Sequence, residues 1–157
     1  MDNNYIFQYW EAIQNGTVTV GKWIKTIYEI LVNGLKSGKW DFDEEKANKA
    51  INFIENFCHH SEGRNDLLKL ELWQKAIVSA IFGIMDKRTG YRQFREVFIV
   101  VARKNGKTLF AAAIAAYMAY IDGEYGAKVY FLAPKLDQAD LVYDAFYQIV
   151  QADDELD

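Results

Sequence analysis

The residues best suited to chemistry form the segment Arg103-Lys104-Asn105-Gly106-Lys107-Thr108. The types in its second half suit the binding of phosphate. A glycine lets backbone amides approach an anion closely, a lysine places an ammonium against terminal phosphates, and a threonine hydroxyl can complete a Mg²⁺ shell. A helix that began here would add unpaired N–H groups and the positive end of its dipole. The segment therefore predicts a phosphate-binding loop.

An expected strand and an expected helix flank this loop. Residues 95–101 are a short run rich in β-branched residues, typical of a buried parallel strand. Residues 107–121 are rich in alanine and contain neither glycine nor proline, which favours a helix. Gly-Lys-Thr also occurs in ordinary surface turns, but a strand before it and a helix after it favour phosphate binding.

The rest of the chain extends this pattern. A second buried strand is expected at residues 128–133 and a last helix at residues 136–150. This order of elements predicts a right-handed parallel crossover of an α/β sheet. Two strands alone do not make a stable doubly wound sheet, so the sheet is expected to be incomplete.

The N-terminal part predicts a helical region interrupted by loops. Apolar residues recur there at helical spacing, and their aromatic side chains indicate helix packing. Glu44 and Glu45 place negative charge where it suits the start of a helix. The predicted helices cover about residues 5–15, 20–37 and 43–61, and a fourth, apolar one covers residues 67–81.

Composition and charge limit the class of protein. Of the 157 residues, 51% are hydrophobic and only one is proline, which argues against disorder. The net charge of −4 does not indicate a nucleic-acid binder. The charges are nevertheless segregated, because the charged residues between 86 and 107 are seven basic and two acidic, and every charged residue after Lys135 is acidic. A solvated helix face is the simpler explanation of those acids.

Cys58 is the only cysteine, so an internal disulfide is excluded and a reducing compartment is expected. The neighbouring His59 and His60 suggest a metal site only weakly, because adjacent residues on a helix point in different directions. No secretory signal is visible, and no apolar run approaches the roughly 20 residues needed to span a bilayer. We therefore expect a soluble protein of the cytoplasm.

Hydrolysis of a bound nucleotide needs an acid on a later strand. The candidates are Asp153, Asp154 and Glu155, but Ile149 and Val150 before them continue a helical periodicity. These acids are therefore predicted to be a solvated chain end. We expect either that the sequence stops before the acid-bearing strand or that another chain supplies the acid, and the first is simpler.

Three motifs in this order resemble the large terminase subunit of tailed bacteriophages, a family of ATP-driven motors that package DNA. They are Leu-Glu-Leu-Trp-Gln-Lys at residues 70–75, the segment 95–108, and Phe-Leu-Ala-Pro-Lys-Leu-Asp-Gln-Ala at residues 131–139. The resemblance covers about residues 50–157. It accounts for Val101 in place of the usual first glycine, because the family uses a deviant Walker A loop.

The resemblance implies individual roles. Lys107 would contact phosphate, Arg103 would stabilise charge on the γ-phosphate, and Gln74 would read the adenine edge, for which a carboxamide is suited. The structural alternative for Gln74 is a helix surface residue, and Trp73 is expected in the core rather than stacked on the base. The predicted ATP-binding residues are Gln74, Arg103, Lys104, Asn105, Gly106, Lys107 and Thr108, with Arg103 as the catalytic residue and Thr108 as the Mg²⁺ ligand.

For the whole chain, the resemblance implies an α/β fold with an incomplete P-loop NTPase parallel sheet, its strands at about 95–101 and 128–133. A helical N-terminal region at 1–66 would precede the first half of the ATPase domain at 67–157, which ends before the Walker B strand.

A full-length protein would couple ATP hydrolysis to translocation of double-stranded DNA and cut DNA with a C-terminal endonuclease, in the cytoplasm of the host cell. The 157-residue chain itself is expected to be inactive. Implied partners are double-stranded DNA, the small terminase subunit, the portal or procapsid, and further copies of the chain, without a membrane.

Two alternatives stay open at this point: a helicase-like P-loop ATPase, and a non-catalytic helical interaction module with a vestigial loop. The roles of Arg88, Arg92 and Arg95 are also open between contact with DNA, contact with a neighbouring subunit and a solvated loop.

Overall fold

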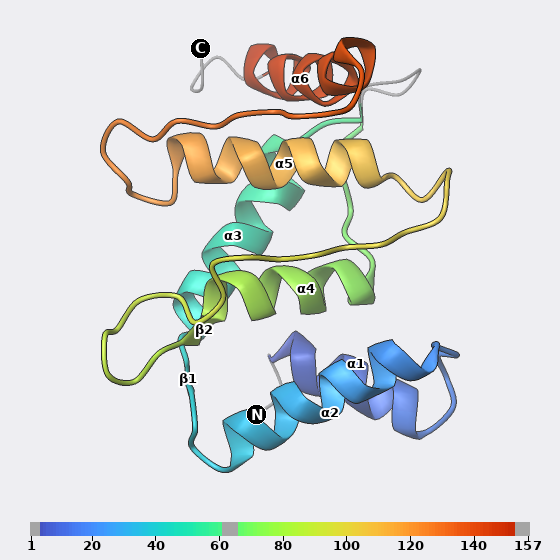
Figure 1. The fold of residues 1–157 in the computed structure, drawn as a ribbon, viewed down its shortest axis with the longest axis vertical. Helices are drawn as coiled ribbons and strands as arrows, with labels where there is room; N and C mark the ends of the chain where they lie inside the picture. Colours follow the sequence, from blue (N-terminus) through green and yellow to red (C-terminus); the bar gives the residue numbers. More distant parts are fainter. Residues whose placement is uncertain (1–3, 61–65, 153–157) are drawn as a thin grey trace. The chain divides into compact units, whose positions relative to one another are not determined.

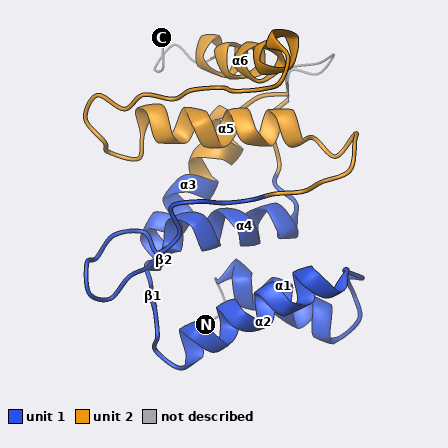
Figure 2. Cartoon of the chain, viewed as in Figure 1, with its two compact units in different colours: residues 1–51, 70–98 blue, residues 52–69, 99–157 orange. Residues whose placement is uncertain are grey.

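The computed structural model describes residues 4–60 and 66–152, which form two compact units (Figures 1 and 2). Unit 1 comprises residues 1–51 and 70–98, and unit 2 comprises residues 52–69 and 99–157. The predicted domain boundary between residues 66 and 67 stays a prediction. The described elements are α1 (Tyr5–Gln14), α2 (Lys22–Lys36), β1 (Asp41–Phe42), α3 (Glu44–Phe57), α4 (Leu72–Gly83), β2 (Ile84–Met85), α5 (Lys107–Tyr120) and α6 (Leu136–Gln151).

The predicted helices are confirmed, and their ends have local causes. Asn4 caps α1, because its side-chain oxygen accepts a hydrogen bond of 3.0 Å from the Ile6 N–H. Asp43 does the same for α3 through the Lys46 N–H, at 3.0 Å. Gly38 follows α2 with a φ of 69°, a conformation that glycine adopts without strain. The fourth helix begins at Leu72, later than the predicted residue 67.

The core of unit 1 lies where α1 packs against α2 and α4. Ile6, Val32 and Ala76 are almost completely buried there. The rings of Tyr9 and Tyr28 meet edge to face with centroids 4.7 Å apart, an arrangement that aromatic quadrupoles favour. Burial, with a smaller contribution from Tyr9, raises the pKa of the Tyr28 phenol. Tyr9 and Tyr28 therefore act in packing, as predicted. The prediction was wrong for Trp23 of α2, which is 70% exposed, and for its neighbours Ile24 and Ile27, which are 41% and 52% exposed.

The strands β1 and β2 pair as a two-stranded antiparallel sheet, which was not predicted from the sequence. Asp41 lies opposite Met85 and Phe42 opposite Ile84. The two segments approach closely at Gly83, because a Cβ there would lie 2.6 Å from Cε2 of Phe42. Two residues per strand carry too little periodicity for prediction from sequence.

Unit 2 is built around the packing of α5 on α6 (Figure 2). The buried face of α5 contains Ala112, Ala113 and Ala116, whose small side chains permit close approach. Ile149 of α6 is also buried. The ring of Phe53, in the part of α3 that belongs to unit 2, lies 5.8 Å from the ring of Tyr117.

The predicted parallel sheet is not confirmed. Residues 95–101 and 128–133 form no strand, and within the described ranges the structure holds only the antiparallel pair of β1 and β2. Phe98 is 94% exposed and Leu132 is 92% exposed, so these side chains are not buried as the strands of a sheet core would be. A strand is stable only when other strands satisfy its N–H and C=O groups. The coarser prediction of a mixed helix and strand fold agrees with the structure.

Three further findings bear on the predictions. In the described part of the chain, no helix is long and apolar enough to cross a bilayer. The predicted solvated acids at residues 153–155 lie outside the described residues. The third helix ends at Phe57, earlier than the predicted residue 61, and residues 58–60 are not helical.

Gly34 of α2 is required by its contact with Trp40, and substitution to alanine tests this. A Cβ at Gly34 would overlap the Trp40 indole. We expect Gly34→Ala to lower the free energy of unfolding by about 1–2 kcal/mol, because overpacking outweighs the gain of about 1 kcal/mol in helix propensity. The exposed neighbour Asn33 provides the control. Asn33→Ala should stabilise the protein slightly in urea unfolding, and equal stabilisation by both variants would contradict the overlap.

Candidate phosphate-binding site

The segment that precedes α5 forms a tight turn with two residues in left-handed conformations. Lys104 has a φ of 67° and Gly106 a φ of 64°. In the described part of the chain, Lys104 is the only residue other than glycine with a positive φ. The Asn105 side-chain amide braces the turn by donating to the carbonyl oxygens of Ala102 and Arg103, at 3.3 and 3.4 Å. A lysine held in this region costs about 1–2 kcal/mol, which is typical of functional turns.

The start of α5 leaves backbone donors without helical acceptors. Gly106 occupies the N-cap position and no side chain caps the helix. The first intrahelical bond runs from the Phe110 N–H to the Gly106 carbonyl oxygen, at 2.9 Å. The N–H groups of residues 107–109 therefore have no acceptor within the helix. Such a helix end is suited to bind an anion.

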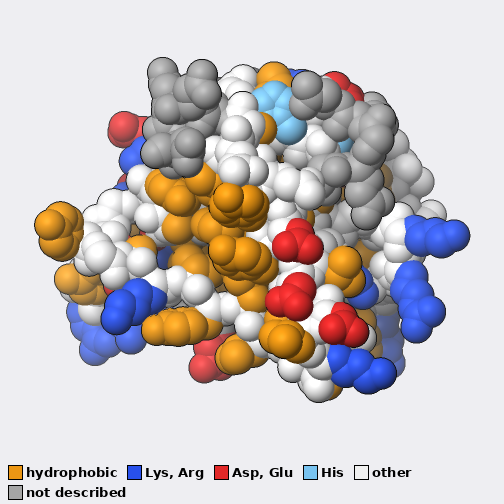
Figure 3. All heavy atoms as spheres, turned by 90° about the horizontal axis from the view of Figure 1, so that it is seen from above, with side chains coloured by type: hydrophobic (Ala, Val, Ile, Leu, Met, Phe, Trp, Pro, Cys, Tyr) orange, Lys and Arg blue, Asp and Glu red, His pale blue; other side chains and the backbone are white. Residues whose placement is uncertain are grey.

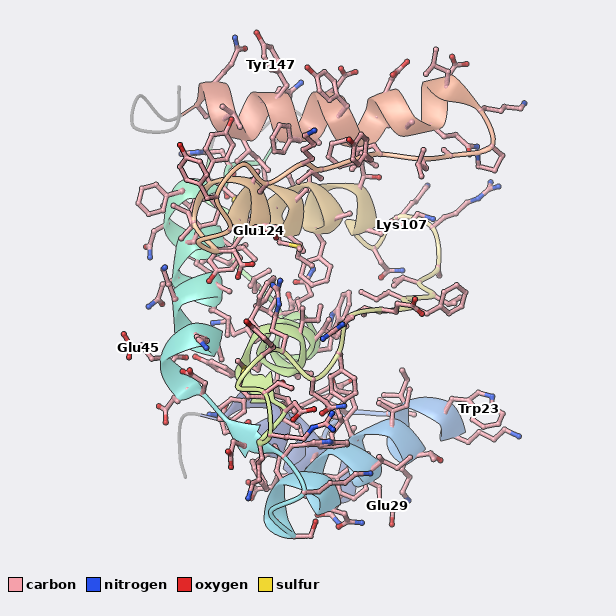
Figure 4. The ribbon with its side chains drawn as sticks, turned by 60° about the vertical axis from the view of Figure 1, so that its left-hand side comes forward. Trp23, Glu29, Glu45, Lys107, Glu124 and Tyr147 are labelled. Atoms are coloured by element: carbon pink, nitrogen blue, oxygen red, sulfur yellow. The ribbon has the colours of Figure 1, made fainter. Side chains whose placement is uncertain are left out.

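Electrostatics at this end strengthen the same conclusion. Arg103, Lys104 and Lys107 are exposed cations, and Lys107 lies at the first helical position (Figure 4). The sequence holds no acid between residues 97 and 121. Cations are unfavourable beside the positive end of a helix dipole. An anion bound at the turn would relieve this repulsion, and Thr108, half-buried in the first turn, would lie next to it.

The structure gives Gln74 a structural role that the sequence analysis did not predict. Its side-chain oxygen accepts a hydrogen bond of 2.8 Å from the Glu71 N–H, and the Glu71 side chain accepts from the Gln74 N–H. This reciprocal pair is a capping box at the start of α4. Gln74 is only 7% exposed, so the alternative of a surface residue was wrong. Gln74 belongs to unit 1 and the turn to unit 2, and its role in reading adenine stays a prediction.

The neighbouring Trp73 packs, half-buried, against the core of unit 1, as expected.

Cys58 lies at the end of α3 and is fully buried. Its carbonyl oxygen accepts a hydrogen bond of 2.7 Å from the Leu68 N–H. Burial raises the pKa of its thiol to about 12. Among the described residues, no three His, Cys, Asp or Glu side chains are grouped to hold a metal ion. Cys58 is therefore a core residue, and the metal interpretation of the Cys-His-His cluster gains no support.

The uncapped start of α5 and the cationic turn before it are suited to bind an anion. Residues 72–156 match the family described as the terminase large subunit, ATPase domain. Because the match covers more than half of the chain, the protein belongs to this family, as its motifs predicted. Comparison with curated proteins and with solved structures gave no match.

Gly106 and Gly21 permit a matched test of the turn. Both occupy N-cap positions with open space around them, but Gly21 has a φ of −69° and Gly106 a φ of 64°. We expect Gly106→Ala to lower the free energy of unfolding by about 1 kcal/mol more than Gly21→Ala, because only Gly106 requires the left-handed region. Calorimetry would show a lower melting temperature for Gly106→Ala. Equal shifts would mean that the turn is not held in this conformation.

The thiol of Cys58 should be protected in the folded protein. A buried thiol with a raised pKa holds little thiolate at neutral pH, and the thiolate is the reactive form. We expect Ellman's reagent at pH 8 to react at least about 100-fold more slowly with folded than with urea-unfolded protein. Since Cys58 is the sole cysteine, the signal has one source. Reaction of the folded protein at the unfolded rate would contradict its burial.

Proposed function

We propose that this chain is the nucleotide-binding part of a DNA-packaging terminase, and that it binds ATP with Mg²⁺ at the turn before α5. One observation carries the proposal: an uncapped helix begins at a strained, cation-rich turn within the region that matches the terminase ATPase family. The strained turn and its clustered cations destabilise the start of α5, and a bound anion would offset this cost. A triphosphate supplies that anion.

The residues of the turn divide the task. Lys107 would neutralise the terminal phosphates, and the N–H groups that follow Gly106 would donate to phosphate oxygens. The Thr108 hydroxyl would be a ligand of Mg²⁺, which when bound draws negative charge from the β- and γ-phosphates. Arg103 is exposed and free to stabilise charge that develops on the γ-phosphate. Lys104 and Asn105 would shape the turn around the phosphates.

Gln74 remains the proposed contact for the adenine edge. Its capping bond uses only the side-chain oxygen, at 2.8 Å from the Glu71 nitrogen. A carboxamide also carries an N–H₂ group with two donors, and adenine N7 accepts such a donor. The cap would thus hold the amide in a fixed orientation for the base.

In the assembled motor, the full-length protein would use ATP hydrolysis to translocate double-stranded DNA and would cut DNA with a separate nuclease part. Its partners would be double-stranded DNA, the small terminase subunit, the portal or procapsid, and other copies of the chain. Membership of the terminase family favours this function over the helicase-like alternative. A non-catalytic module with a vestigial loop is excluded only by measured nucleotide binding.

The lysine at the start of α5 provides that measurement. We expect Lys107→Ala to weaken the binding of a fluorescent ATP analogue with Mg²⁺ at least about tenfold, because it removes the charge nearest the terminal phosphates. Lys128→Ala is the matched control, since Lys128 is also an exposed lysine of unit 2 and its loss changes the net charge equally. Identical titration curves for the wild type and the two variants would leave the vestigial loop as the better account.

A further inference from the structure

One exposed face of α6 combines apolar and acidic side chains. Residues spaced by three, four and seven positions on a helix share a face, and Leu136, Tyr143 and Tyr147 are related in this way. Leu136 is 75% exposed, Tyr143 50% and Tyr147 48%. Tyr147 projects from α6 on the side away from α5 (Figure 4). We call this set, together with the carboxylates of Asp140 and Asp144 on the same face, the α6 face.

The aromatic part of the α6 face is held in place before any partner binds. The rings of Tyr143 and Tyr147 stack with centroids 6.3 Å apart. The Tyr147 hydroxyl accepts a hydrogen bond of 2.8 Å from the Gln151 side chain. Tyr143 also meets the ring of Phe131 at 6.4 Å. Rigid tyrosines lose little conformational entropy on binding and are common anchors of protein interfaces.

Charge determines what can cover this face. Asp140 and Asp144 are exposed beside the tyrosines, and Figure 3 shows carboxylates next to gathered hydrophobic side chains on this side of the molecule. Residues 136–152 contain no lysine or arginine, so no cation of α6 balances them. The carboxylates repel nucleic acid and anionic membranes. The complementary occupant is a basic protein segment that carries an aromatic anchor.

Unit 1 displays such a segment in the loop of residues 86–95, which we call the basic loop. It holds four Lys or Arg residues and one acid. Its centre carries Tyr91, which is 70% exposed. Arg88 and Arg95 are exposed and face only the Asp86 carboxylate within the loop. Lys87 is engaged elsewhere, with its Nζ 3.4 Å from Oδ1 of Asp41. Arg92 lies over the Phe82 ring, 5.4 Å from its centroid.

Hydrogen bonds hold residues 86–91 of the basic loop in a defined turn. The Asp86 N–H donates to the Tyr91 carbonyl oxygen at 2.9 Å, and the Gly90 N–H donates to the Asp86 carbonyl oxygen at 2.8 Å. The Asp86 carboxylate accepts from the N–H groups of Arg88 and Thr89, and these bonds lower its pKa. Two surfaces that are already ordered bind with a smaller entropic cost.

We propose that the α6 face of one copy of this chain binds the basic loop of a second copy. Asp140 and Asp144 would pair with Arg88 and Arg95, and Tyr91 would pack against the stacked rings of Tyr143 and Tyr147. The inference rests on the self-association contained in the proposed function and names its surfaces. The two surfaces differ, so the contact is heterologous, and repetition forms a ring or an open chain.

Charge reversal tests the pairing. Two double variants place like charges opposite one another: Asp140→Lys/Asp144→Lys on the α6 face and Arg88→Glu/Arg95→Glu on the basic loop. Sedimentation at low salt should show that either double variant raises the dissociation constant for self-association at least about tenfold. An equimolar mixture of the two variants should associate again, and so should the variant with all four changes. Glu11→Lys/Glu29→Lys, at exposed sites of unit 1, changes the net charge as the first variant does and should leave association unchanged.

Three outcomes overturn this pairing. In the first, the wild type stays monomeric at all concentrations. In the second, the double variants associate like the wild type. In the third, the double variants are monomers with a lowered melting temperature that the fourfold variant restores, which places the contact within one chain. Binding of the fluorescent ATP analogue by each variant separates this test from the nucleotide proposal. Nucleotide binding that persists without rescued association refutes the interface alone, whereas rescued association without Lys107-dependent binding refutes the nucleotide site alone.

Discussion

The candidate site depends on one electrostatic conflict, which is the placement of three cations at the positive end of α5. A helix start is normally satisfied by an acid or by a capping side chain. At Gly106 and Lys107 the chain has neither, although Asn4 and Asp43 cap α1 and α3 in the usual way. The starts of α2 and α6 also lack a side-chain cap, so the start of α5 is distinguished by its left-handed turn and its three cations rather than by the missing cap alone.

The rest of unit 2 holds this helix end in place. The alanines of α5 let it pack closely on α6, and Tyr117 contacts Phe53 of α3. Burial of the remainder of α5 offsets what the strained turn costs, because each buried apolar side chain contributes on the order of 1–3 kcal/mol. Unit 1 uses aromatic packing in the same way, with Tyr9 and Tyr28 between its first two helices.

The helices could be predicted because their apolar residues recur at a fixed spacing and their ends carry Asn, Asp or Gly. The turn at residues 103–106 could be located from residue types, but the left-handed Lys104 could not, because lysine carries no signal for that conformation. The burial of Gln74 was missed, since the polar residue is buried through its bond to the Glu71 backbone rather than through its own hydrophobicity. Residues 95–101 and 128–133 have strand-like composition, but composition does not supply the neighbouring strand that a sheet requires.

These two extended segments have a practical consequence for the protein in solution. They expose apolar side chains, Phe98 and Leu132 among them, and backbone N–H and C=O groups that are not paired in a sheet. Such segments can pair with a β-strand of another molecule. Association through these segments is driven by the hydrophobic effect, which sulfate strengthens. Attraction between carboxylates and guanidinium groups is screened by any salt. Comparison of self-association in ammonium sulfate and in sodium chloride therefore distinguishes association through the extended segments from association through charge.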